Sequence, residues 1–220
     1  MTDFAVAGAR ALPHAAAPTI AFGLRIRDPR PIQAILLNCQ LRIEPRRRPH
    51  TLEEKQRLAD IFGAPDRWGE TLHPLTWTQA TVNVPAFEGG AKVNLPVPCT
   101  YDFEVTAAKY LAAMENGEIP LRFLFSGTIF VKSETGFLVE QIPWSKDAAY
   151  RMPVAIWREV MNFYFPSSGW IRLQRDTLAR LQRERAQHGY TSWEELFESL
   201  LAESTHKGEL KCAPLAGPSR

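Results

Sequence analysis

Apolar and polar residues alternate along two neighbouring stretches near the start of the chain, residues 19–26 and 32–43. Alternation at every second position places the apolar side chains on one face of an extended strand. Residues 27–31 contain two prolines and predict a turn between these strands. The pattern is typical of antiparallel strands that bury one face. The apolar faces are Ile20, Phe22, Leu24 and Ile26 in the first stretch and Ile35, Leu37, Cys39, Leu41 and Ile43 in the second.

A helical signal interrupts this strand pattern before it resumes. Thr51 and Glu54 have the spacing of a capping box, and Gly63 stands where a helix commonly ends, so a short helix is predicted near residues 52–62. Further strands are predicted over 76–84, 91–96, 101–105, 121–131 and 136–142, with a short helix over 107–114.

The last third of the chain changes to helical periodicity. One helix is predicted to begin at Pro153, a second covers 173–185, and a third follows the capping-box pair Ser192 and Glu195. The first has its apolar face at Val154, Trp157, Val160, Met161 and Tyr164. The third has its apolar face at Trp193, Leu196, Phe197, Leu200 and Leu201, which we expect to lie in the core.

The order of these elements predicts an α+β protein, an antiparallel β-sandwich or sheet followed by C-terminal helices packed on it. We expect a β-rich part over residues 1–145 and a helical part over 146–203 that shares its core. Residues 204–220 are rich in Lys, Gly and Pro and predict a flexible tail.

Composition and charge narrow the class of protein. The 220 residues are 45% apolar, and 26 basic against 24 acidic residues give a net charge of +2. This balance does not favour nucleic acid as a partner. Three separated cysteines, no secretory signal and no apolar run of about 18 residues predict a cytoplasmic protein without membrane insertion.

Catalytic and metal motifs with a recognisable spacing are missing from the sequence. It has no dinucleotide-binding or phosphate-binding glycine loop, no zinc helix and no nucleophile elbow. The five histidines are far apart, and none has a ligand partner at metal-binding spacing. We therefore expect no metal and no cofactor, and we favour a non-catalytic role.

Two features are candidates for binding a protein partner. Trp144 follows Pro143 in a loop between strand and helix, where it either anchors a partner or packs between the two parts of the chain. Arg46, Arg47 and Arg48 form a basic triplet that either contacts an acidic partner or stays solvated.

A small-molecule pocket is the alternative. Asp102 and Glu104 share one face of a predicted strand, and Tyr101 and Cys99 lie close in sequence. Paired carboxylates can exchange protons or hold a cation, although the pair also suits the solvated face of a strand. A reactive Cys99 would need a base or positive charge nearby, and no histidine is near in sequence.

Six runs of residues carry a family resemblance. They are CQLRIEP at 39–45, PVPCTYDFEV at 96–105, GEIPL at 117–121, FSGTIF at 125–130, QIPW at 141–144 and YFP at 164–166, followed by Gly169 and Trp170. These runs resemble an uncharacterised bacterial protein family whose genes commonly stand beside those of high-affinity uptake nickel–iron hydrogenases. The likeness covers roughly residues 3 to 202. It implies an accessory or chaperone-like protein that assists maturation or assembly of a hydrogenase and binds one of its subunits or maturation factors.

Overall fold

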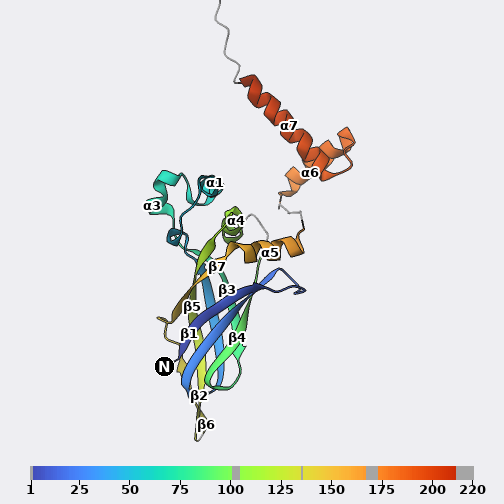
Figure 1. Ribbon diagram of the computed structural model, residues 1–220. Helices are drawn as coiled ribbons and strands as arrows, with labels where there is room; N and C mark the ends of the chain where they lie inside the picture. Colours follow the sequence, from blue (N-terminus) through green and yellow to red (C-terminus); the bar gives the residue numbers. More distant parts are fainter. Residues whose placement is uncertain (1, 101–104, 135, 167–172, 212–220) are drawn as a thin grey trace, which may run out of the picture. The chain divides into compact units, whose positions relative to one another are not determined.

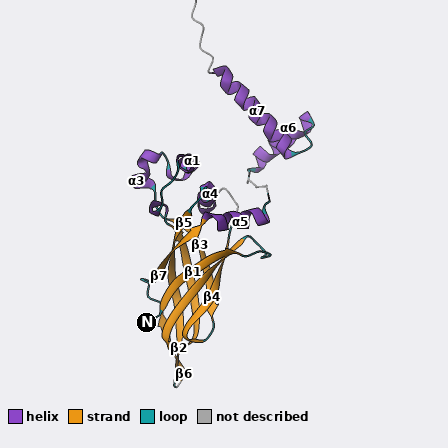
Figure 2. Cartoon of the chain, viewed as in Figure 1, coloured by secondary structure: helices purple, strands orange, loops and turns teal. Residues whose placement is uncertain are grey.

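The computed structural model describes residues 2–100, 105–134, 136–166 and 173–211, with side chains described as far as residue 204. The chain divides into two compact units, Met1–Ile171 and Arg172–Arg220. The first contains the sheet and the second contains two helices (Figures 1 and 2).

Seven antiparallel strands form the sheet of the first unit, so the predicted α+β class with an antiparallel sheet is confirmed. The 25-residue strand β2 is its centre. β3 and β4 follow one another along one edge of β2, and β1 and β5 share the other edge. The far edge of β5 carries β6 and β7. The strands are β1 (Asp3–Ala11), β2 (Thr19–Ile43), β3 (Leu75–Val84), β4 (Phe87–Pro98), β5 (Glu118–Ser133), β6 (Gly136–Gln141) and β7 (Asp147–Pro153).

The turn predicted at residues 27–31 is wrong, because these residues continue β2. The buried Asp28 carboxylate accepts hydrogen bonds from the backbone N–H and the guanidinium of Arg30, and from the Thr2 hydroxyl. Pro29 and Pro31 have no N–H to donate to the ladder, and the N–H of Arg30 between them donates to the Asp28 carboxylate. The pairing with β4 shifts register between Asp28 and Ile32. A second shift, against β5, follows between Ile32 and Ala34, and there the buried positions change from even to odd numbers. The prolines therefore interrupt the pairing without ending the strand.

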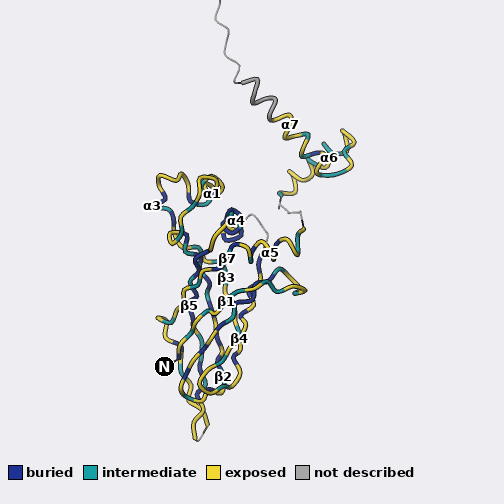
Figure 3. The backbone as a smooth tube through the Cα atoms, in the orientation of Figure 1, coloured by how far each residue is buried: buried dark blue, intermediate teal, exposed yellow. Residues whose placement is uncertain are grey.

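The core lies between the inward faces of the bent sheet (Figure 3). Phe22, Phe123 and Phe125 are almost fully buried there, and Phe4 of β1 stacks on Phe125 with ring centroids 4.7 Å apart. α4 (Thr106–Ala113) and α5 (Val154–Tyr164) add further buried apolar residues. The predicted helix after Pro153 is α5. Residues 147–153, which the sequence assigned to the helical part, instead form β7 against β5.

A helical insert joins β2 to β3. The predicted capping box is present, since Thr51 Oγ1 accepts from Glu54 N and the Glu54 carboxylate accepts from Thr51 N. The helix expected over 52–62 is divided at Leu58 into two shorter ones. The insert contains η1 (Pro45–Arg47), α1 (Leu52–Arg57), α2 (Ala59–Phe62), η2 (Pro65–Arg67) and α3 (Trp68–Thr71).

The second unit is a pair of helices, α6 (Arg175–His188) and α7 (Trp193–Lys211), joined at Gly189, which has the positive φ of 68° that ends a helix. Leu196 is fully buried, but Leu200 is 37% and Leu201 66% exposed. The expected five-residue core face is therefore only partly buried in this unit. α7 also continues to Lys211, into the segment predicted to be a flexible tail from 204.

Candidate functional site

A tight turn between β6 and β7 displays Trp144. Ile142 N donates to Gly127 O at 2.9 Å, Phe125 N donates to Lys146 O at 2.9 Å, and Lys146 N closes the turn on Pro143 O at 3.0 Å. These bonds fix both ends of the turn to β5. The Trp144 side chain nevertheless is 92% exposed. The sequence placed Trp144 in a loop as an anchor or as a staple between parts, and the structure leaves this indole in solvent.

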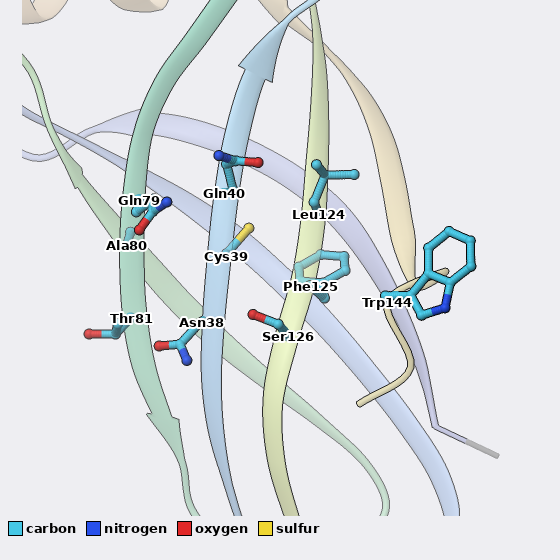
Figure 4. Close-up of a pocket in the computed structure, with 10 residues that line it drawn as sticks. All are labelled: Asn38, Cys39, Gln40, Gln79, Ala80, Thr81, Leu124, Phe125, Ser126 and Trp144. Carbon is cyan, nitrogen blue, oxygen red and sulfur yellow. The ribbon is translucent and has the colours of Figure 1, made fainter. Parts of the chain in front are cut away.

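The turn lies beside a shallow hollow of about 500 Å³ on the outward face of β3, β2 and β5 (Figure 4). The register places Asn38 between Thr81 and Ser126, and the next outward row has Gln40 between Gln79 and Leu124. The residues that line the hollow are Asn38, Cys39, Gln40, Gln79, Ala80, Thr81, Leu124, Phe125, Ser126 and Trp144. None of these side chains carries a charge, so the hollow suits hydrogen bonding and apolar contact better than ion binding.

The same outward face becomes apolar toward β6. Leu36 of β2 is 48% exposed, and Phe137 and Val139 of β6 are each 58% exposed. Val139 pairs with Phe130, and the Phe130 and Phe137 rings make an edge contact at 5.6 Å. We call Leu36, Phe130, Phe137, Val139 and Trp144 the outer apolar surface. Exposed apolar residues gathered in this way mark interaction sites more often than isolated ones do.

Arg46 and Arg48 of the predicted basic triplet are occupied within the chain. Arg46 donates through Nε to Leu72 O and through Nη2 to Gly69 O, both at 2.6 Å. Arg48 Nη2 donates to the Glu54 carboxylate at 2.7 Å, and the Arg48 side chain is only 9% exposed. These bonds hold the helical insert.

Arg47 has a half-exposed side chain, and its contact with Glu44 is long, at 3.9 Å. Contact of the triplet with a partner stays a prediction, and the guanidinium of Arg47 is less engaged within the chain than those of Arg46 and Arg48.

Cys99 is buried, and burial raises the pKa of its thiol to about 12. A cavity of about 190 Å³ adjoins it, lined mainly by Trp77, Trp157 and Ala107. That volume is below the roughly 300–1,000 Å³ of ordinary ligand pockets. Tyr101, Asp102 and Glu104 lie outside the described residues, so the alternative pocket is represented here by Cys99 alone.

Sequence reasoning missed Leu36, Phe137 and Val139. Residues 136–142 were predicted as a strand, but a run of three apolar residues is ordinarily read as a strand buried on both faces. The available signal was the absence of alternation over residues 137–139. This signal could not distinguish a buried strand from an apolar edge strand, because the difference depends on which strands lie alongside.

The profile of the Family of unknown function (DUF6084) matches residues 1–209, nearly the whole chain. The chain belongs to this family. No curated protein matches this DUF6084 chain. In the part of the chain that the structure describes, no three His, Cys, Asp or Glu side chains are grouped to hold a metal ion, and no helix is long and apolar enough to cross a membrane.

Solved structures resemble the DUF6084 chain only weakly. One is a solution structure of a late embryogenesis abundant (LEA) protein, with 11% identity over 70% of this chain and 72% of that one and a TM-score of 0.32. Another is a β-glucosidase from Kluyveromyces marxianus, with 10% identity over 69% of this chain but only 15% of that one and a TM-score of 0.24. Neither likeness is close enough to carry an argument about fold or function.

Proposed function

We propose that the protein is a non-catalytic binding protein that docks a protein partner on the outer apolar surface, with Trp144 as the anchor. The observation that carries this proposal is the 92% exposure of Trp144 on a turn that backbone hydrogen bonds fix at both ends. An indole in solvent contributes little to folding. The backbone of its turn is already fixed and loses little further freedom on binding, and buried Trp side chains are frequent hot spots of interfaces.

The rest of the surface supports the same mode of binding. Leu36, Phe137 and Val139 are each about half exposed. A partner that covers them would remove their apolar surface from water, which favours binding. The uncharged hollow beside Trp144 offers amide and hydroxyl groups for a polar rim. Arg47 would contribute through its charge, which affects association rate more than final affinity.

We further propose that the partner is a subunit or maturation factor of a nickel–iron hydrogenase and that binding takes place in the cytoplasm. This part of the proposal rests on the resemblance carried by the six sequence runs. The protein would hold an apolar segment of the partner during maturation or assembly and release it chemically unchanged. The alternative, a small-molecule site at Cys99, is less favoured because its thiol stays protonated at neutral pH.

Co-purification tests the proposal. The tagged protein is expressed in a host that makes a nickel–iron hydrogenase, and the hydrogenase subunits recovered with it are quantified. Trp144→Ala should reduce their recovery at least about tenfold, since truncating an anchor costs about 2 kcal/mol or more. Leu52→Ala is the matched control, because Leu52 is 72% exposed but lies on the helical insert. Equal recovery with Trp144→Ala and wild type, or no recovery with wild type, contradicts the proposal.

A further inference from the structure

β6 is an edge strand, and together with the end of β5 it projects beyond the other strands at one end of the sheet (Figure 1). It pairs with β5 from Ser133↔Gly136 to Thr128↔Gln141, and among the described residues no strand pairs with its other edge. Phe137, Leu138 and Val139 are 58%, 59% and 58% exposed, so both faces of this edge are apolar.

The backbone groups that face the open edge follow from the hydrogen-bond pattern. Ile142 N donates to Gly127 O, which makes these two residues a hydrogen-bonded pair. In antiparallel strands such pairs alternate with pairs that do not exchange hydrogen bonds. Leu138 and Glu140 therefore bond to β5, while Phe137, Val139 and Gln141 direct their N–H and C=O groups outward. The outward N–H and C=O groups of β6 can therefore pair with another antiparallel or parallel strand.

Two other edge strands carry features that β6 lacks. β4 has Lys92, Pro96 and Pro98, and β1 has a register shift between Val6 and Gly8. Lysine, proline and irregular register all hinder pairing with another chain. β6 contains no proline and no lysine, and its one charge, Glu140, is paired with Arg30 at 2.7 Å. An exposed apolar edge without such features is a template for pairing with another chain.

We infer that a partner protein binds by adding an extended, uncharged segment with apolar side chains at alternate positions to the open edge of β6. The inference rests on the proposed function and names its mode of binding. The added strand would exchange backbone hydrogen bonds with Phe137 and Val139, as in other β-strand additions. Its side chains on one face would continue the outer apolar surface toward Trp144, which follows β6 directly in the chain.

A second copy of this chain is a poorer occupant of the edge. A six-residue strand is about 20 Å long. Pairing two such strands covers far less than the roughly 1,200 Å² that stable interfaces bury. The paired charge of Glu140 also leaves nothing to set the register between two copies. A foreign segment that reaches Trp144 as well as β6 uses more of the exposed apolar surface.

The test uses the full chain and a nine-residue peptide of alternating threonine and valine with a lysine at each end. A control peptide has proline in place of the central valine. Amide hydrogen exchange is followed by NMR. The alternating peptide should slow exchange at Phe137 and Val139 at least about tenfold, while Leu138 and Glu140, already bonded to β5, change little. No binding at millimolar peptide, equal effects from both peptides, or protection elsewhere overturns the inference.

Two substitutions separate the backbone contribution from the side-chain contribution. Val139→Pro removes an N–H that faces the open edge and no bond to β5, whereas Val139→Thr keeps that N–H and the β-branched shape. If the peptide adds as a strand, its affinity should be about tenfold or more weaker for Val139→Pro and within about threefold of wild type for Val139→Thr. Equal affinities of the two variants for the peptide overturn the inference. If Trp144→Ala abolishes hydrogenase recovery but Val139→Pro does not, the strand mode fails while the proposed function stands. If neither variant changes recovery, both fail.

Discussion

Arg48 and Glu54 form an ion pair with an Nη2–Oε1 distance of 2.7 Å, and their side chains are 9% and 1% exposed. The same carboxylate also caps α1 at Thr51 and accepts from Glu115 N at 3.1 Å, so one buried charge ties the helical insert to the segment after α4. This arrangement makes Arg48 part of the fold. Arg47, its neighbour in sequence, has a side chain that is 51% exposed.

This pair predicts opposite outcomes for neighbouring arginines. Arg48→Ala should lower the free energy of unfolding by about 3–5 kcal/mol, because it leaves Glu54 buried without its counter-charge. Arg47→Ala should change it by no more than about 0.5 kcal/mol. Denaturant melts of the two variants provide the comparison. Similar losses in both would show that the ion pair does not stabilise the insert.

Asp28 predicts an acid-sensitive contribution to stability. Hydrogen bonds from Arg30 and, secondarily, from Thr2 hold the pKa of this carboxyl well below its usual range, against the opposing effect of burial. A depressed pKa stabilises the folded state above the unfolded value near 4, and the contribution is lost as pH falls below that value toward the folded pKa. Wild type should therefore exceed Asp28→Asn in stability at pH 6 by a margin that shrinks steadily from about pH 4 to pH 2. A margin independent of pH would contradict this assignment.

Trp144 and Trp157 should respond differently to the same truncation. Trp157 is 3% exposed, and Trp157→Ala should cost about 3–5 kcal/mol of unfolding free energy. Trp144→Ala should cost at most about 0.5 kcal/mol. It should also remove fluorescence that acrylamide quenches readily, because its indole is in solvent. Marked destabilisation by Trp144→Ala would show instead that this tryptophan packs within the protein.

The thiols of Cys39 and Cys99 should be inert in the folded protein. Burial raises the pKa of each to about 12, so little of the reactive thiolate exists at neutral pH. In a Cys212→Ser background, a disulfide reagent at pH 8 should modify both sites slowly in buffer and rapidly in guanidinium. Fast modification of Cys99 in buffer would favour the alternative of a reactive pocket.

Leu196 and Leu200 test the helical phase of the second unit. Leu196 is fully buried and Leu200 is 37% exposed, although the sequence pattern places both on one apolar face. Leu196→Ala should destabilise this unit by about 2–4 kcal/mol and Leu200→Ala by about 1 kcal/mol or less. Helix melting followed by circular dichroism measures both. Equal effects would indicate that Leu200 is buried in solution.

The candidate site was predicted in part. Trp144 was identified because a tryptophan flanked by proline between a strand and a helix is unusual, and the structure leaves it exposed. Contact of the basic triplet with a partner stays a prediction, but its three arginines are not equivalent. Arg46 and Arg48 find their acceptors at Leu72, Gly69 and Glu54. Nothing local in a run of three arginines distinguishes Arg47 from the two whose guanidinium groups bond within the chain.

The sequence by itself determined the elements whose signal is a short repeat. Period-two alternation predicted the strands, and the capping residues Thr51 and Ser192 marked helix starts, because both signals depend only on residues a few positions apart. The tertiary structure decided that β2 continues through Asp28 and the two prolines and that Phe137 and Val139 lie on an open edge. Both outcomes depend on segments far away in the chain. Asp28 is bonded by Thr2 and Arg30 by Glu140, and β6 has no strand beside its other edge among the described residues. Local periodicity states which face of a strand is apolar, but only the packing of distant strands determines whether that face is covered.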